Sequence, residues 1–171
     1  MKIVVNGINA NLRFSSAHII PTHGLCGHIH GHSYFVDVEI EGEQSGNFDF
    51  IVDFIDVKDS VRKVCRELDH RILIPIFNKK IKFKSSNHEN VDMDFFKNKE
   101  YLEFSIEDKE YKIPKVDSVI LPLKHSSAEE LAKYFSDKIS NDILSKGGDI
   151  ESITIGVNEG IGQGAFFKKS L

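Results

Sequence analysis

The sequence contains little cysteine and no tryptophan: Cys26 and Cys65 are the two thiols in 171 residues. Two thiols cannot build the disulfide framework of a small secreted domain, so a reducing cytoplasm is the simple expectation. Proline is also scarce, with four residues against twelve glycines, which argues against a disordered or collagen-like chain. No apolar run approaches the roughly 18–20 residues of a membrane span. These absences leave an ordinary globular protein.

An excess of positive charge is lacking too. The chain has 22 Lys and Arg against 26 Asp and Glu, a formal net charge of −4. We therefore expect neither nucleic acid nor a membrane as a partner, although a local basic pocket is compatible with this total. The N-terminal segment turns polar at Asn6, too early for a secretory signal. The length suits one domain over residues 1–171.

Hydrophobic patterning predicts an α+β fold. Alternating apolar residues indicate strands over residues 2–17, 33–42 and 152–160. Spacings of three and four indicate a helix from near Asp53–Asp56, and a second helix after Ser127, which is expected to form a capping box with Glu130. We expect an antiparallel sheet of about four strands with both helices on one face. Its unpaired edges favour association of subunits into a closed barrel.

Residues 77–117 fit this pattern less well. Short runs such as KIKFKSS, YLEFSIED and KEYKIPKV indicate strands in one or two hairpins. The polar stretches 84–94 and 97–100 are expected to be mobile loops. The segment is therefore interpreted as an irregular, strand-containing insert within a single domain.

Histidine is the unusual feature, because five of the eight lie within fifteen residues: His18, His23, His28, His30 and His32. In an extended chain, positions i and i+2 point to the same side, so H-G-H presents two imidazoles side by side. An antiparallel partner strand would bring His18 to the same place. Three imidazoles with one open position describe a catalytic zinc site, whereas surface histidines in a loop are the alternative reading. Adding His18 and Cys26 to H-G-H favours a metal, with zinc as the default ion.

Other residues are candidates for proton transfer or binding. Cys26 shortly precedes H-G-H and is a candidate base or nucleophile, whereas Cys65 lies on a helical apolar stripe and is interpreted as a small buried residue. Asp69 precedes His70, and an aspartate can orient an imidazole in a proton relay. Glu159 follows an apolar strand, where its carboxylate either accepts paired N–H donors from a flat heterocycle or is merely exposed.

Taken together, these residues resemble the 6-pyruvoyl-tetrahydropterin synthase family, and specifically its 6-carboxy-tetrahydropterin synthase branch. The family landmarks occur in order along nearly the whole chain, and only the stretch from about 77 to 117 lacks a counterpart. They are F-S-S-A-H at 14–18, Cys26, H-G-H at 30–32, V-D-F at 52–54, L-D-H at 68–70, S-A-E-E-L-A at 127–132 and Glu159. The short gap between Cys26 and H-G-H resembles the carboxy branch, since pyruvoyl enzymes carry a longer one.

The resemblance implies the tunnelling fold, in which a two-helix, four-stranded unit trimerises into a barrel and two trimers stack as a hexamer. It also implies a role for each candidate residue. Zinc would be held by His18, His30 and His32. Cys26 would be the catalytic thiol, and Asp69 and His70 of a neighbouring subunit would complete its proton relay. Glu159 would bind the pterin, with the hydroxyl of Ser127 nearby.

The implied substrate is 7,8-dihydroneopterin triphosphate. The carboxy branch converts it to 6-carboxy-5,6,7,8-tetrahydropterin, acetaldehyde and triphosphate, on the route to 7-deazaguanine bases such as queuosine. Alternatives are a pyruvoyl product, another side-chain cleavage such as one giving a hydroxymethyl pterin, or a non-catalytic pterin-binding module. Two departures bear on this choice: Glu159 precedes Gly160 where the family usually has Glu-Thr, and Ser127 stands where Thr is common.

Overall fold

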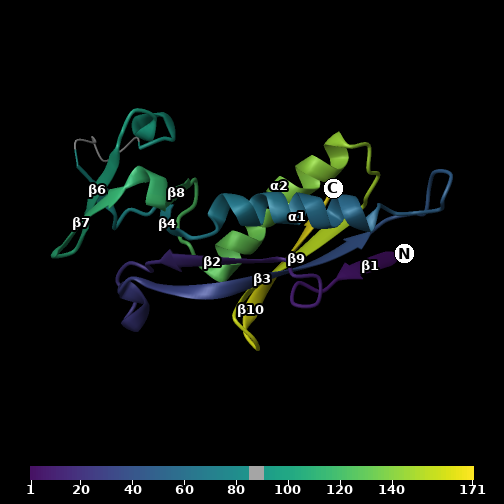
Figure 1. The fold of residues 1–171 in the computed structure, drawn as a ribbon, viewed down its shortest axis with the longest axis horizontal. Helices are drawn as coiled ribbons and strands as arrows, with labels where there is room; N and C mark the ends of the chain where they lie inside the picture. The colour runs from purple at the N-terminus through teal and green to yellow at the C-terminus, as the bar shows by residue number, and fades with distance from the viewer. Residues whose placement is uncertain (85–90) are drawn as a thin grey trace.

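The computed structural model describes residues 1–84 and 91–171, and it shows the helices on one side of a long sheet (Figure 1). In these residues the α-helices are α1, Phe54–Leu68, and α2, Ala128–Ser145. The strands of the main sheet are β1 Lys2–Val5, β2 Arg13–His18, β3 His30–Glu41, β4 Arg71–Pro75, β8 Ser118–Leu121, β9 Ser152–Glu159 and β10 Gly164–Ser170.

In the described part of the chain, the main sheet has seven strands in the order β10–β9–β3–β2–β4–β8, with β1 also paired to β3. β9 runs antiparallel along one side of β3, and β1 and β2 pair antiparallel with the two halves of its other side. The α+β class and the antiparallel centre are thus confirmed. The expected four strands are wrong, because β4 and β8 extend the sheet by parallel pairing. β10, an edge strand that the sequence pattern did not indicate, pairs with β9.

The extended segment predicted over residues 2–17 is divided by a turn between β1 and β2. The backbone N–H of Gly7 donates to Asp37 Oδ1 on β3 at 2.7 Å. A Cβ at this glycine would lie 2.5 Å from Val36 O, so only glycine permits the close approach. The turn lets β2 begin again along the other half of β3, and this register positions the histidines of the site.

Both helices begin where the sequence predicted, but only α1 has the expected kind of cap. The Asp53 carboxylate accepts the N–H of Ile55 at 2.7 Å. The side chain of Ser127 makes no capping hydrogen bond to α2, and Glu130 instead pairs with Lys133 at 2.8 Å. The predicted capping box is therefore wrong. No helix of the described residues is long and apolar enough to cross a membrane.

The main core lies between the helices and the sheet. Phe14 of β2 stacks between Tyr34 of β3, at 4.6 Å between ring centroids, and Phe135 of α2, at 5.5 Å. All three side chains are fully buried. Because even-numbered residues of β2 and β3 face the helices here, the histidines on these strands face the same way.

The insert forms a second, smaller sheet rather than an irregular segment. Among the described residues its strands are β5 Lys82–Phe83, β6 Tyr101–Ile106 and β7 Lys109–Pro114, all antiparallel. The predicted short strands are confirmed, while residues 85–90 of the predicted loop 84–94 lie outside the described part. A separate apolar cluster joins this sheet to β4 and to Ile19, which directly follows β2.

Candidate metal centre and active site

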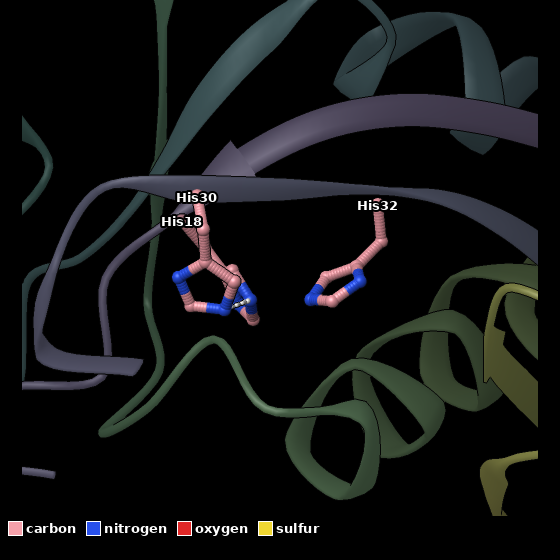
Figure 2. A group of neighbouring side chains, drawn as sticks. All are labelled: His18, His30 and His32. Atoms are coloured by element: carbon pink, nitrogen blue, oxygen red, sulfur yellow. Dashed lines mark hydrogen bonds between the residues drawn. The ribbon is translucent and has the colours of Figure 1, made fainter. Parts of the chain in front are cut away.

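Three imidazoles converge where β2 ends and β3 begins (Figure 2). His18 ends β2 and is the ladder partner of His30 on β3, and His32 follows two positions later on the same face. One ring nitrogen from each lies within 4.8 Å of the others, so the group could hold a metal ion. The His30 and His32 rings extend from β3 on the side that faces the beginning of α2, and the His18 ring from β2 lies beside that of His30. The predicted convergence of these three side chains is confirmed.

Gly31 is needed for this arrangement. A Cβ there would lie 2.8 Å from the backbone oxygen of Ser16 on the neighbouring strand. Any side chain would therefore push β2 and β3 apart at the point where their histidines meet. The glycine of H-G-H thus keeps the two strands close enough for their imidazoles to share one site.

Backbone carbonyls fix the tautomers of two rings. His18 Nδ1 donates to Ser126 O at 2.8 Å, and His30 Nδ1 donates to His28 O at 2.9 Å. The Nε2 atoms of these two rings face each other at 3.0 Å. Burial lowers the pKa of His18 to about 4, so its ring is neutral near pH 7 and its Nε2 carries a lone pair. This lone pair faces Nε2 of His30, so a shared cation could take both ring nitrogens as ligands.

His32 supplies a further nitrogen without a partner. Its Nε2 is buried and has no hydrogen-bond partner within the described residues. Glu159 Oε2 lies 3.8 Å away, beyond hydrogen-bond reach. A buried polar atom of this kind calls for a ligand. Three imidazoles are a donor set that zinc, copper, iron and nickel all accept, so the residues present fit a transition-metal ion.

A cavity of about 500 Å³ opens beside the three histidines. Cys26 lines it from the short 3-10 turn Leu25–Gly27, which connects β2 to β3. Ser127 lines it from the start of α2, and Glu159 from the end of β9. The structure therefore brings the imidazoles, the thiol and both candidate pterin-binding residues to one cavity. Cys65 lies elsewhere: it is buried in α1, and burial raises the pKa of its thiol to about 12.

Glu129 and Gln163 also line this cavity, although the sequence analysis gave neither a role. The backbone N–H of Glu129 and the hydroxyl of Ser127 hold the pKa of the Glu129 carboxyl below its usual value. The motif S-A-E-E-L-A, which contains Glu129, was the sequence feature that could have indicated this position. Gln163 lies in the turn from β9 to β10, where its carbonyl accepts the N–H of Glu159 at 3.1 Å. The glycine-rich sequence of this turn gave no pattern from which the position of Gln163 could be predicted.

Asp69 and His70 form their predicted pair, but away from the cavity. His70 Nδ1 lies 2.9 Å from Asp69 Oδ2, and Asp69 Oδ1 accepts the N–H of Ser15 at 2.7 Å. Partial burial works against ionisation, yet these bonds lower the pKa of Asp69 below its usual value. The His70 side chain is 85% exposed and borders a separate hollow of about 620 Å³, which shares only His32 with the first. Within one chain, the pair does not meet the Cys26 cavity.

This arrangement agrees with a comparison against known protein families. The model described as 6-pyruvoyl tetrahydropterin synthase matches residues 7–170. The chain belongs to the 6-pyruvoyl tetrahydropterin synthase family. The matched range spans the main sheet from before β2 to the end of β10, and the insert lies within that range.

Relatives in sequence and a similar solved structure carry the names of two different reactions of the family. A protein of Methanocaldococcus jannaschii, provisionally named 6-carboxy-5,6,7,8-tetrahydropterin synthase, is 43% identical over 172 residues, which cover 100% of this chain and 98% of its own. The 6-carboxy-5,6,7,8-tetrahydropterin synthase of Haemophilus influenzae is 37% identical over 71 residues, covering 39% of this chain and 50% of its own. The 6-pyruvoyl tetrahydropterin synthase structure from Plasmodium falciparum superposes with a TM-score of 0.83 at 30% identity, covering 100% and 98%.

Proposed function

We propose that this protein is a zinc-dependent 6-carboxy-5,6,7,8-tetrahydropterin synthase. It would convert 7,8-dihydroneopterin triphosphate and one water molecule to 6-carboxytetrahydropterin, acetaldehyde and triphosphate, and so supply a precursor of 7-deazaguanine bases. The observation that carries the proposal is one cavity of about 500 Å³ lined by three converging imidazoles, a thiol and a carboxylate. The names of relatives that span the chain support the choice of reaction.

Two residues that line the cavity, Glu159 and Ser127, would bind the substrate. The Glu159 carboxylate would accept N–H donors from the flat edge of the pterin, since a carboxylate can take two parallel hydrogen bonds. Ser127 would contribute its hydroxyl from the start of α2. Glu159 ends β9 beside the side chain of His32, at 3.8 Å. A pterin held by its ring edge would therefore carry its side chain toward the imidazoles.

His18, His30 and His32 would hold the zinc ion through their ring nitrogens. An ion held there would supply Lewis-acid chemistry, which would polarise the oxygens of the substrate side chain and make the adjacent C–H bonds more acidic. Cys26 faces the same cavity, and its sulfur would accept the proton from carbon and later return it. The two bonds from ring nitrogens to carbonyls keep the His18 and His30 rings oriented during these transfers.

Asp69 and His70 would complete the relay from a neighbouring subunit of a homo-oligomer, a dimer of trimers. Two observations support this assignment. The His70 ring is 85% exposed, yet its Nδ1 is oriented by Asp69 at 2.9 Å, so its Nε2 points outward as a proton carrier. β10 and β1 also present strand edges with which a second copy can pair.

Mixing two inactive variants tests the shared relay. Cys26→Ala and His70→Ala proteins should each lose turnover, and dissociating and reassembling them together should restore part of it, because some interfaces then combine an intact thiol with an intact imidazole. Light scattering would establish the oligomer. Mixed oligomers without any activity would contradict the relay between subunits.

Product analysis tests the reaction itself. Zinc-loaded protein should consume 7,8-dihydroneopterin triphosphate and give 6-carboxytetrahydropterin by mass spectrometry, with an equal amount of acetaldehyde in a parallel assay. The second candidate is pyruvoyl formation, favoured by the similarity to the Plasmodium falciparum structure. A pyruvoyl product would select that reaction, and a hydroxymethyl product would instead indicate a different cleavage of the side chain. Unchanged substrate, with zinc bound and the fold intact, would leave a pterin-binding module.

A further inference from the structure

The loop that carries Cys26 receives little support from the strands it connects. The β2–β3 ladder ends at the His18–His30 pair, so residues 19–29 lie beyond its last rung. The 3-10 turn in this loop buries no residue, and its first residue, Leu25, is 87% exposed. Backbone hydrogen bonds within the loop hold its local shape, among them Ile20 N–H to Cys26 O at 2.8 Å. Because the turn has few buried contacts, its position relative to the sheet depends on other elements.

The insert contacts this loop at both of its ends. At the beginning, Ile19 is 3% exposed and packs in the apolar cluster of the insert, with Phe83 and Phe104 among its members. At the far end, the Lys109 ammonium donates to the carbonyl oxygen of Gly27 at 3.3 Å, across 82 positions of sequence. These two contacts have different chemistry and come from different parts of the insert.

Lys109 is well placed to keep that contact. It opens β7 and pairs with Ile106 of β6, so it stands directly after the tight turn of the hairpin. The residues between them include Glu107, whose φ of 55° fixes the turn. The lysine is half-buried, and a charged donor makes a stronger hydrogen bond to a carbonyl than a neutral one. The contact therefore ties the β6–β7 hairpin to a loop whose turn buries no residue.

We propose that the insert stabilises the Cys26 loop and that Lys109 is a positioning residue for the thiol. Gly27 directly follows Cys26, so fixing the Gly27 carbonyl limits the motion of the peptide that carries the thiol. The next carbonyl, that of His28, is held by the His30 ring at 2.9 Å. Lys109 thus acts on the thiol side of the loop, separately from the imidazoles. The catalytic part of this inference rests on the function proposed for Cys26.

Exchange and alkylation measurements on the zinc-loaded full chain test the proposal without substrate. Lys109→Met keeps the length of the side chain and removes the donor. We expect amide hydrogen exchange in residues 20–28 to rise about tenfold, and alkylation of Cys26 by iodoacetamide to become several-fold faster. Lys109→Arg can still donate and should stay within about twofold of the unmodified protein. Cys65 serves as an internal reference because it is buried.

Lys112→Met is the matched control, because this lysine lies on the same strand but pairs with Glu103 and the Tyr101 ring inside the insert. It should leave the loop unchanged. Equal exchange in the Lys109 and Lys112 variants would overturn the proposal. So would a rise spread evenly over residues 101–114, which would mean that Lys109 stabilises only its own hairpin.

Turnover gives a further readout. If Cys26 acts as proposed, Lys109→Met should lower kcat about tenfold with little change in KM, since Glu159 and Ser127 are untouched, and Lys109→Arg should restore most of it. A chain that shows the exchange effect but no turnover of the pterin triphosphate would refute the proposed function and leave the stabilised loop standing. An unchanged kcat alongside faster exchange would overturn the positioning role.

Discussion

The imidazoles and the thiol line the same cavity, yet the fold holds them in different ways. His18 and His30 are partners in a strand ladder, and a backbone carbonyl fixes each ring. Cys26 lies in a turn that buries no residue, and a lysine from the insert bonds the next carbonyl. Metal ligands and a group that moves protons both need a defined geometry. The fold supplies it for the imidazoles through the strand ladder, and for the thiol loop partly through a contact from the insert.

The largest expected effect separates metal binding from turnover. His32→Ala should reduce zinc from one ion per chain to nearly none and abolish activity, because three ligands become two. Cys26→Ala should keep the zinc but lower kcat by about 10²- to 10⁴-fold, the usual contribution of a general acid or base. Elemental analysis and steady-state rates measure both. His23→Ala is the control, since this residue lines the cavity without joining the ligand group. Loss of zinc from Cys26→Ala would show that the thiol also binds the metal and would contradict this separation of roles.

A smaller effect is the pH dependence of the free energy of unfolding that His18 should cause in the metal-free protein. The pKa of His18 falls from its ordinary 6.5 to about 4 on folding, because the ring is buried. As the pH drops below 6.5, the unfolded chain takes up a proton that folded His18 refuses until about pH 4. The free energy of unfolding should therefore be highest above pH 6.5 and decrease across this window by at most about 3 kcal/mol.

Urea unfolding of chelator-treated protein at pH 7.5 and pH 5 measures this decrease. His18→Gln removes the titrating ring from the same buried position and should flatten the dependence. An equally steep dependence in that variant would show that other groups cause it.

The smallest expected effect compares one substitution in the two regions. Gly31→Ala would place a Cβ 2.8 Å from the Ser16 backbone oxygen, so the ladder must shift. We expect it to cost about 1–3 kcal/mol of stability and to weaken zinc binding. Gly24→Ala meets nothing within 4 Å, and its φ of 30° should cost about 1 kcal/mol without affecting zinc. Thermal unfolding and zinc titration check both. Similar zinc affinities in the two variants would contradict the contrast.

The sequence predicted best what depends on neighbours in the chain. Alternation and the i, i+2 rule were enough to bring His30 and His32 to one face, and the short link back to His18 favoured an antiparallel partner. β10 was missed because its exposed, alternating residues follow a glycine-rich turn and bury little. β4 and β8 were missed as parallel partners because short apolar runs do not state with which strand they pair.

The placement of the remaining site residues depends on distant contacts that no local pattern records. Asp69 and His70 are held by the backbone of Ser15, 54 positions away from Asp69. Lys109 reaches Gly27 from a segment that the sequence analysis treated as irregular. The capping box expected at Ser127 does not form, and Glu130 pairs with Lys133 one helical turn away. The first two placements therefore depend on tertiary contacts, whereas the missing cap accompanies a competing pair within the same helix.

The register of His18 with His30 has a consequence for how this site can change. Residues 19–29 close a connection whose two ends are already fixed by the ladder. Doubling the length of a flexible connection costs only about 0.6 kcal/mol of closure entropy. Insertions or deletions there can therefore move the thiol relative to the substrate while both rings stay in place. Loop length is thus a variable through which evolution or protein engineering can redirect the fate of the substrate on an unaltered coordination site.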